Sequence, residues 1–333
     1  MTPAARLPTP RRWALIVVAA IGLGLIVAPF AFQMFTRAPK GADMIAGFKP
    51  YMTDARLQTY QTEIHQINAA VHETNTTAAA AVTSGGGASA FAARLPDVAA
   101  FNTGWPAINT SMSTMLTTIR ANVGNYNDVV ALPKFTLFPW FFVIPGVLIL
   151  AFAAAALIRP AWWSWVRWVL VVLGIGLVLA PVAFQMFTRA PAGGRMVDAF
   201  RTIETQSNVQ SIQRDFGTIA SGEGAIQLEL VPALRASGLS DAQIAARYPA
   251  ITTLERNWVP ILNNFTPMIG AMSDNVTNYE AVKALPPFPL FPWFFVLPGV
   301  LICAFVLLAR PGRPLVASAS VPASPNTVSE GGP

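Results

Sequence analysis

Long apolar stretches without Asp, Glu, Lys, Arg or His recur four times along the chain. They cover residues 13–36, 135–158, 168–188 and 288–309, and each is at least 21 residues long. About 20 apolar residues are enough for an α-helix to cross the hydrocarbon core of a bilayer. The pattern therefore predicts an all-α integral membrane protein with four transmembrane helices.

Polar segments lie between the first and second stretches and between the third and fourth, and their apolar residues recur in steps of three and four. The clearest stripes are Leu57, Tyr60, Ile64, Ile67 and Val71 in the first segment and Val209, Ile212, Phe216 and Ile219 in the second. Such spacing places one apolar face along a helix. We expect each segment to form a helical hairpin, with the first turning at 84–87. Packing both hairpins into a four-helix bundle would bury stripes that one hairpin leaves partly exposed.

The second half of the chain repeats the first. Residues 28–39 read APFAFQMFTRAP and residues 180–191 read APVAFQMFTRAP; residues 138–146 read FPWFFVIPG and residues 291–299 read FPWFFVLPG. These matches predict a tandem duplication of a unit made of a transmembrane helix, a helical hairpin and a second transmembrane helix. Because each unit has an even number of spans, the two copies should be parallel and related by an axis along the membrane normal.

Charge is concentrated outside the two polar segments. The tails and the link at 159–167 carry seven basic residues and one acidic residue, and their sum of +6 equals the net charge of the chain. Positively charged loops stay in the cytoplasm, so the termini and the link are predicted to be cytoplasmic and both polar segments extracytoplasmic. The excess of Arg over Lys, with abundant Ala, Pro and Gly, suggests a bacterial protein of the plasma membrane.

These arguments divide the chain into nine predicted regions. They are a cytoplasmic tail (1–12), the first span (13–36), an extracytoplasmic helical domain (37–134), the second span (135–158), a cytoplasmic link (159–167), the third span (168–188), a second extracytoplasmic helical domain (189–287), the fourth span (288–309) and a disordered cytoplasmic tail (310–333).

Prolines and glutamines occur near the predicted outer ends of the spans. They are Pro29, Pro181, Pro145 and Pro298, with Gln33 and Gln185. The prolines either kink the helices and splay them into a shallow vestibule, or reflect the ordinary tolerance of membrane helices for proline. The glutamines either hydrogen-bond to each other or contact a solute. Ala20, Gly24 and Ala28 form a small-residue stripe that favours close packing, which predicts the first and third spans at the bundle centre.

Several polar and aromatic residues of the helical domains occur at matching positions in both halves. They are Gln58, Gln61, Arg94 and Trp105 in the first domain and Gln210, Gln213, Arg247 and Trp258 in the second. Two roles remain open for these residues. They are either hydrogen-bonding partners between helices or candidate contact positions for a binding partner.

Side chains suited to catalysis do not gather in a recognisable pattern. His65 and His72 lie seven residues apart on one helix face, but Gly217 replaces His65 in the second half. The sequence lacks a glycine-rich phosphate loop and the common hydrolase and zinc-protease motifs. We therefore expect no enzymatic activity, no cofactor and no metal site. The polar segments also lack a basic groove, which argues against nucleic acid as a partner.

The remaining function classes are non-catalytic. The spans lack the charged residues that ion-driven transporters place in mid-membrane. Our leading hypothesis is an accessory or scaffolding subunit that binds a membrane-protein partner, a second copy of itself or envelope lipid through the extracytoplasmic bundle. One alternative is a passive pore or a component of lipid or solute transport. Another is a sensor, because the layout of span, bundle and span resembles the sensory half of bacterial chemoreceptors and histidine kinases; its short cytoplasmic segments would then require a partner for output.

Overall fold

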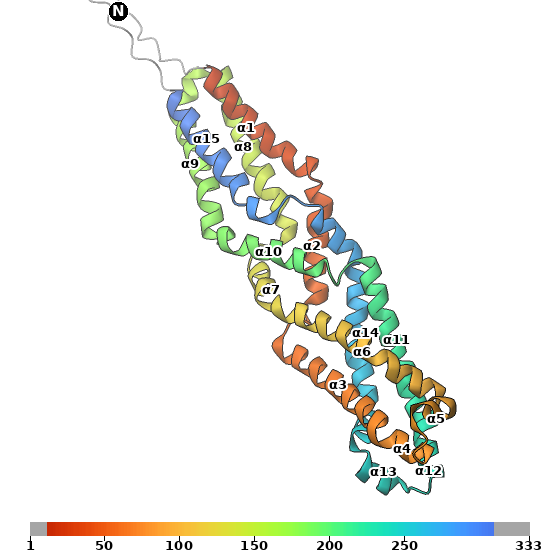
Figure 1. Ribbon diagram of the computed structural model, residues 1–333. Coiled ribbons are helices and arrows are strands. Elements are labelled where there is room, and N and C mark those ends of the chain that lie inside the picture. The colour runs from red at the N-terminus through yellow and green to blue at the C-terminus, as the bar shows by residue number, and fades with distance from the viewer. Residues whose placement is uncertain (1–11, 310–333) are drawn as a thin grey trace, which may run out of the picture.

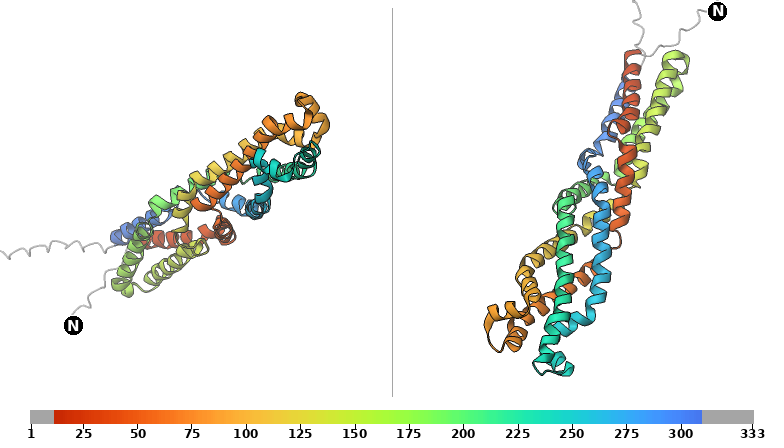
Figure 2. Two further views of the ribbon diagram at one scale, coloured as in Figure 1. Left: turned by 90° about the horizontal axis from the view of Figure 1, so that it is seen from below. Right: turned by 90° about the vertical axis from the view of Figure 1, so that its right-hand side faces the viewer.

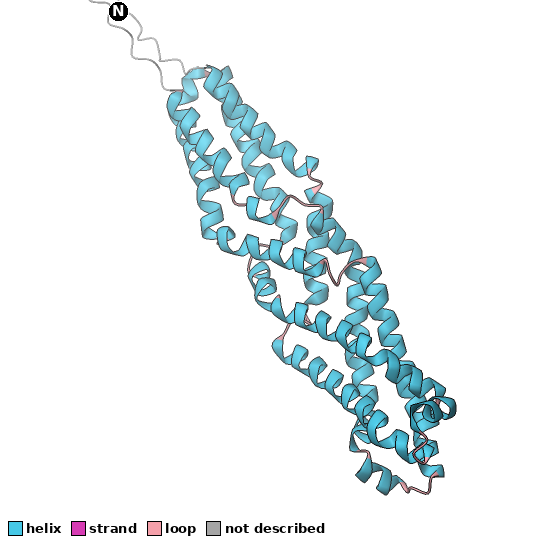
Figure 3. Ribbon diagram, viewed as in Figure 1, coloured by secondary structure: helices cyan, strands magenta, loops and turns pink. Residues whose placement is uncertain are grey.

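Helices dominate the structure. The computed structural model describes residues 12–309, and this range contains no β-strand (Figure 3). Within it, four segments are long and apolar enough to cross a membrane: Arg12–Ala31, Phe135–Ile158, Pro160–Ala183 and Phe288–Leu308. The all-α class and the four candidate spans are confirmed. The predicted tails lie outside the described residues, apart from Arg12.

The four longest apolar helices pack side by side as an apolar bundle. They are α1 (Arg12–Ala31), α8 (Phe138–Ile158), α9 (Trp163–Ala183) and α15 (Trp293–Leu308) (Figure 1). α1 packs against α8 and α15, and α9 packs against the same two helices. α1 and α9 therefore lie diagonally opposite each other, and the expectation that the first and third spans meet at the centre is wrong.

Facing glycines set the closest approaches in the apolar bundle. A Cβ added to Gly22 would lie 3.0 Å from the carbonyl oxygen of Gly146, and one added to Gly146 would lie 2.8 Å from that of Gly22. Gly174 and Gly299 face each other in the same way between α9 and α15. The small-residue stripe predicted close packing at Gly24, but a Cβ added there would have no described atom within 4 Å. The sequence thus predicted packing through small residues but not which of them face a neighbour.

The first and third spans end earlier than predicted. α1 ends at Ala31 and α2 (Met34–Phe48) begins after Gln33, while α9 ends at Ala183 and α10 (Met186–Phe200) begins after Gln185. Both glutamines have φ 53° and ψ 35°, which is the left-handed conformation. A residue in this conformation cannot continue a right-handed helix, so the chain changes direction here.

α2 and α10 carry the chain away from the apolar bundle, and each packs against a helix of the other half. α2 lies against α14 (Pro249–Lys283), and α10 lies against α7 (Val123–Val130). Arg37 donates a hydrogen bond to the carbonyl oxygen of Ala284 at 2.7 Å, and Arg189 donates one to that of Ala131 at 3.0 Å. These alanines end α14 and α7. Cations are favourable at helix C-termini, so the two arginines tie the halves together reciprocally.

A second four-helix arrangement, the distal bundle, lies beyond this region. It consists of α3 (Asp54–Glu73), α6 (Pro96–Ala121), α11 (Gln206–Ala225) and the first part of α14. α3 packs against α6 and α14, and α11 packs against the same two. The side chains of Thr53 and Thr205 accept hydrogen bonds from the backbone and cap α3 and α11, as residues of this type commonly do.

Short helices close the far end of the distal bundle. The predicted turn at 84–87 is present, with positive φ at Ser84, Gly85 and Gly87, but a further helix follows it before the return helix α6. The short helices are α4 (Ala79–Thr83), α5 (Gly87–Arg94), α12 (Val231–Ala236) and α13 (Asp241–Arg247), preceded by π-helical turns at Thr74–Ala78 and Ile226–Leu230. Single 3₁₀ turns occur at Phe135–Leu137, Pro160–Trp162 and Phe288–Leu290.

The whole molecule is an elongated rod (Figures 1 and 2). The start of α1, the end of α15 and the turn between α8 and α9 lie together at the apolar end. The short helices α4, α5, α12 and α13 lie at the opposite end.

Candidate functional site

A polar groove runs between α3 and α6 on the side of the distal bundle. Its volume is about 260 Å³. The lining residues are Gln61, Ile64, His65 and Asn68 from α3 and Asn109, Ser113, Leu116 and Thr117 from α6. Amide and hydroxyl groups dominate this surface, and His65 is its one titratable side chain among the described residues.

Hydrogen bonds from buried or neighbouring residues hold the polar walls of the groove in place. Trp105 is buried and donates from Nε1 to Oδ1 of Asn68 at 2.9 Å. Arg120 donates from Nη1 to Oε1 of Gln61 at 2.7 Å and from Nη2 to Oε1 of Gln58 at 3.4 Å. Of the sequence-predicted contact residues, Gln58, Gln61 and Trp105 therefore belong to this groove or its supports.

The chemistry of the groove is that of recognition. Its amides and hydroxyls can donate and accept hydrogen bonds, but a nucleophile with an adjacent base is not among the lining residues. Activating a nucleophile requires such a base within hydrogen-bonding reach. The groove is therefore better suited to binding a polar surface of another molecule than to catalysis.

The second half of the chain carries apolar or small residues at most of the matching positions. Gly217, Ala220, Leu262, Gly270 and Ser273 occupy the places of His65, Asn68, Asn109, Thr117 and Arg120. The second half keeps a polar residue at only two lining positions, where Gln213 matches Gln61 and Thr266 matches Ser113. Because the sequence prediction selected positions that match between the halves, it missed His65, Asn68, Asn109 and Arg120 as a group. The absence of such residues at the matching positions of the second half was the sequence signal that could have identified them.

The remaining predicted contact residues are scattered. Gln210 and Gln213 are exposed on α11. Arg94 donates a hydrogen bond to the carbonyl oxygen of Val82 at 2.7 Å, which ties α5 to α4. Arg247 is exposed at the far end of the rod, and Trp258 is buried in the distal bundle.

Polar contacts between α3 and α14 hold the two halves of the distal bundle together. Arg56 donates to Oδ1 of Asn264 at 2.8 Å, and the amide nitrogen of Asn264 donates to Glu63. Asn257 donates to Gln66 at 3.1 Å. Burial raises the pKa of Glu63, and the bond from Asn264 partly offsets this rise. Glu63 thus has a partner that the sequence did not reveal, and its position points to a structural role.

The glutamines and prolines of the spans do not gather at one site. Gln33 and Gln185 are exposed where α1 and α9 end, and the hydrogen bonds of the described residues do not join them. Pro29 and Pro181 are buried, whereas Pro145 and Pro298 are partly buried. Pro298 lines an apolar groove of about 330 Å³ between α1 and α15, together with Gly24, Ala28, Leu297 and Leu301.

Apolar side chains from both halves fill the space between the halves just beyond the apolar bundle. They surround a space of only about 10 Å³, and Phe142 stacks on Phe295 at 4.4 Å between ring centroids. The lining residues are Met34, Ala38, Leu132, Phe135 and Phe138 with their matching partners Met186, Ala190, Leu285, Phe288 and Phe291. A polar path for a solute is not formed by these residues.

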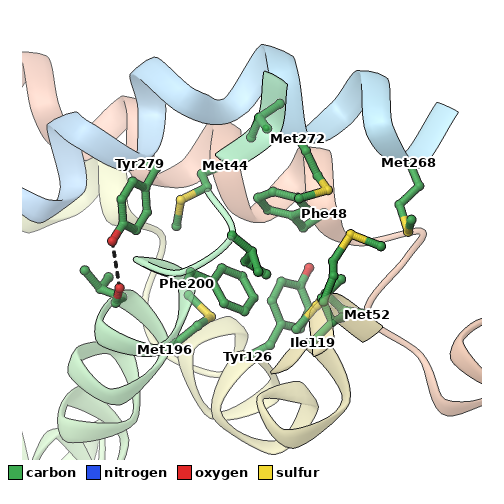
Figure 4. Close-up of a cluster of buried hydrophobic side chains, with 14 of the residues drawn as sticks. Met44, Phe48, Met52, Ile119, Tyr126, Met196, Phe200, Met268, Met272 and Tyr279 are labelled. Atoms are coloured by element: carbon green, nitrogen blue, oxygen red, sulfur yellow. Dashed lines mark hydrogen bonds between the residues drawn. The ribbon is translucent and has the colours of Figure 1, made fainter. Parts of the chain in front are cut away.

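A buried carboxyl group was also missed at the sequence level. Glu204 lies between α10 and α11, is 1% exposed, and has no hydrogen-bond partner for either carboxylate oxygen among the described residues. Burial raises the pKa of Glu204 to about 9. Its neighbours belong to a methionine-rich cluster between α2, α10 and α14 (Figure 4). The one sequence signal was that Met52 occupies the matching position in the first half.

Comparison with known proteins assigns no family to this arrangement. The chain matches no model of a known protein family, and no curated protein matches it. Within residues 12–309, three or more His, Cys, Asp or Glu side chains do not gather into a metal site.

Proposed function

We propose that the chain is a non-catalytic, membrane-anchored accessory or scaffolding subunit of the bacterial cell envelope, which binds a partner protein through the groove between α3 and α6. The groove carries this proposal, because hydrogen bonds from Trp105 and Arg120 fix two of its amide side chains on an open surface of the distal bundle. Four of its polar side chains, those of His65, Asn68, Asn109 and Thr117, have no polar counterpart at the matching positions of the second half. Residues that pack the core are expected in both halves, whereas a surface that binds a partner can be present in one half alone.

The proposed orientation places the distal bundle outside the cell. Arg12, Arg159 and Arg167 lie at the end of the apolar bundle that holds both described termini, and such residues favour the cytoplasmic side. At the same end Arg159 lies 4.9 Å from the ring centroid of Trp162, as in an interfacial aromatic belt. Trp140 in the first turn of α8 and Trp293 at the start of α15 are exposed at the opposite end of the apolar bundle, and we assign them to the second belt.

We also attribute the two halves to one duplicated unit. Matching positions share unusual local features: Gln33 and Gln185 have the same left-handed dihedral angles, and π-helical turns begin at Thr74 and at Ile226. Because each half packs against the other along most of the rod, the two halves together form one elongated body. Such a rod holds the groove at a fixed distance from the membrane, which suits a scaffold.

Site-specific crosslinking in native membranes tests the proposal. A photo-activatable residue replaces Ser113 in the groove, and the matched control replaces Thr266, the exposed residue at the corresponding place in the second half. We expect an adduct with another membrane protein from position 113 and none from position 266. Adducts containing only a second copy of the chain would instead indicate a homodimer. Equal yields at both positions, or no protein adduct at position 113, would contradict the proposed surface.

Lipid binding is a second candidate, favoured by the apolar groove between α1 and α15. This groove opens within the apolar bundle, where acyl chains are the solvent. Gly24→Leu would fill the groove, because a Cβ at Gly24 has free space. We expect the variant to lose copurified lipid in native mass spectrometry, whereas Gly176→Leu at the matching position keeps it. Identical lipid retention in both variants would argue against a specific lipid site.

A passive pore and a sensor receive less support. A pore requires a polar path along the axis, whereas apolar side chains fill the space between the halves. A sensor would require a partner that carries the output. The same crosslinking experiment would reveal that partner.

A further inference from the structure

A small cavity near the middle of the rod is lined by three methionines and one glutamate, together with apolar and aromatic residues. Met52 and Glu204 lie in the turns that follow α2 and α10, and Met268 and Met272 lie on α14. The cavity measures about 10 Å³, which is roughly the space of one water-sized sphere. The other lining residues are Phe48, Tyr51, Ile119, Phe200 and Ile203.

Glu204 is the feature that packing alone does not explain. Its two carboxylate oxygens have no hydrogen-bond partner among the described residues, and Lys, Arg and His are absent from the described lining of the cavity. Burying an unpaired carboxylate is very costly, so a carboxyl group in this position either keeps its proton or is paired with a cation. Met52 shows that the fold accepts an apolar side chain at the matching position. The carboxyl group of Glu204 is therefore not required for the backbone to fold in this way.

The surrounding side chains determine which cation would suit this carboxylate. Met268 and Met272 are four residues apart on α14 and extend from it toward Met52 and Phe48 (Figure 4). Calcium and magnesium need several oxygen ligands, and this cavity offers one carboxyl group. Thioethers are soft ligands that select Cu(I) over harder divalent ions. A bound monovalent cation would replace the proton of Glu204, and its single positive charge would balance the carboxylate that results.

We propose that this cavity binds a soft monovalent cation, Cu(I), through the thioethers of Met52, Met268 and Met272 and the carboxylate of Glu204. The site is separate from the α3–α6 groove and does not depend on the proposed scaffold function. It lies where the two halves meet, because Met52 comes from the first half and the other three residues come from the second. Binding there would crosslink α14 to the turns after α2 and α10.

Competition against a chromophoric Cu(I) chelator under reducing conditions tests the site in the purified full-length protein. We expect the wild type to retain one equivalent of Cu(I). Met52→Leu, Met268→Leu and Met272→Leu should each weaken retention by about tenfold or more, on the scale seen when groups around a bound metal are removed. Glu204→Gln should do the same, because it removes the charge and keeps the shape.

Matched controls come from the same methionine cluster. Met44 and Met196 are buried beside the cavity but do not line it, so Met44→Leu and Met196→Leu should retain Cu(I) like the wild type. Thermal unfolding without metal verifies that each leucine variant is folded. X-ray absorption should find sulfur atoms around the ion in the wild type. The proposal is overturned if wild type and Met268→Leu lose the ion equally readily, or if the control variants weaken retention as much.

Discussion

Single residues in the interior couple the stability of this protein to pH. Glu204 is the clearest case, because burial raises its pKa to about 9 while the same group in the unfolded chain titrates near its ordinary value. The folded state therefore binds one more proton than the unfolded state between those two pKa values. Stability falls with rising pH wherever the folded state binds more protons.

For Glu204 we predict a pH-dependent loss of stability in the metal-free protein. The contribution is fully present below about pH 4.5 and is lost progressively as the pH rises toward 9, by up to about 1.4 kcal/mol per pH unit. Glu204→Leu should flatten this part of the profile. The measurement is the free energy of unfolding from pH 5 to pH 9 for both proteins. Parallel profiles would show that Glu204 is not buried in its acid form.

Two glycines of α11 should respond to alanine with opposite signs. A Cβ on Gly222 would overlap the ring of Phe101 on α6, whereas one on Gly224 has no described atom within 4 Å. We predict that Gly222→Ala destabilises the fold by about 1–3 kcal/mol through overpacking. Gly224→Ala should stabilise it by up to about 1 kcal/mol, because alanine favours a helix. Thermal unfolding checks both, and equal effects would contradict the α6–α11 contact.

At the scale of whole elements, glycine contacts position the helices of the apolar bundle. α1 approaches α8 through Gly22 and Gly146, and α9 approaches α15 through Gly174 and Gly299. Small residues allow close packing of membrane helices. Gln33 and Gln185, which have left-handed dihedral angles, follow α1 and α9 and precede α2 and α10. Each glutamine therefore marks the point where a span ends and the connection to the distal bundle begins.

Gly146→Ala should weaken the pairing of α1 with α8. Its Cβ would lie 2.8 Å from the carbonyl oxygen of Gly22, and backbone atoms cannot rotate away as a side chain can. We predict a loss of about 1–3 kcal/mol in unfolding experiments in detergent micelles. Gly24→Ala on the open face of α1 is the matched control and should stay within about 0.5 kcal/mol of the wild type. A larger loss of unfolding free energy for Gly24→Ala than for Gly146→Ala would contradict the assignment of Gly146, rather than Gly24, to the contact between α1 and α8.

At the scale of the whole molecule, the two halves form one body because every helix of both bundles packs against a helix of the other half. α3 and α11 each contact one helix of their own half and one of the other. The arginines at positions 37 and 189 repeat this exchange between the bundles. The rod therefore has one end with the described termini and one end with the turns near Gly86 and Gly238.

The proposed orientation predicts the location of that far end. Alkaline phosphatase inserted at Gly86 or at Gly238 should be active, because both sites lie in turns at the tip and insertions are best tolerated there. A fluorescent protein that matures only in the cytoplasm should stay dark at both positions. Fluorescence at either position, in a fusion that is still found in the membrane fraction, would show that the far end lies in the cytoplasm and would contradict the proposed orientation.

The sequence alone determined the features that depend on neighbours along the chain. Four apolar runs of membrane-spanning length, and the all-helical structure of residues 12–309, followed from periodicity and composition. A helix satisfies its backbone hydrogen bonds internally, whatever it packs against. The repeat also revealed which positions of the two halves match. The turn at 84–87 followed from its glycines.

Tertiary structure decided everything that depends on which faces meet. The sequence could not choose Gly22 over Gly24, because both are small and only one points at α8. The sequence could not predict that His65 and Asn109 line one groove, or that Met52 and Glu204 line one cavity. The residues of each pair are distant in the chain and belong to no known motif. Side chains become neighbours only when helices take up a definite rotation and register. That choice comes from the packing of the whole molecule rather than from any local pattern.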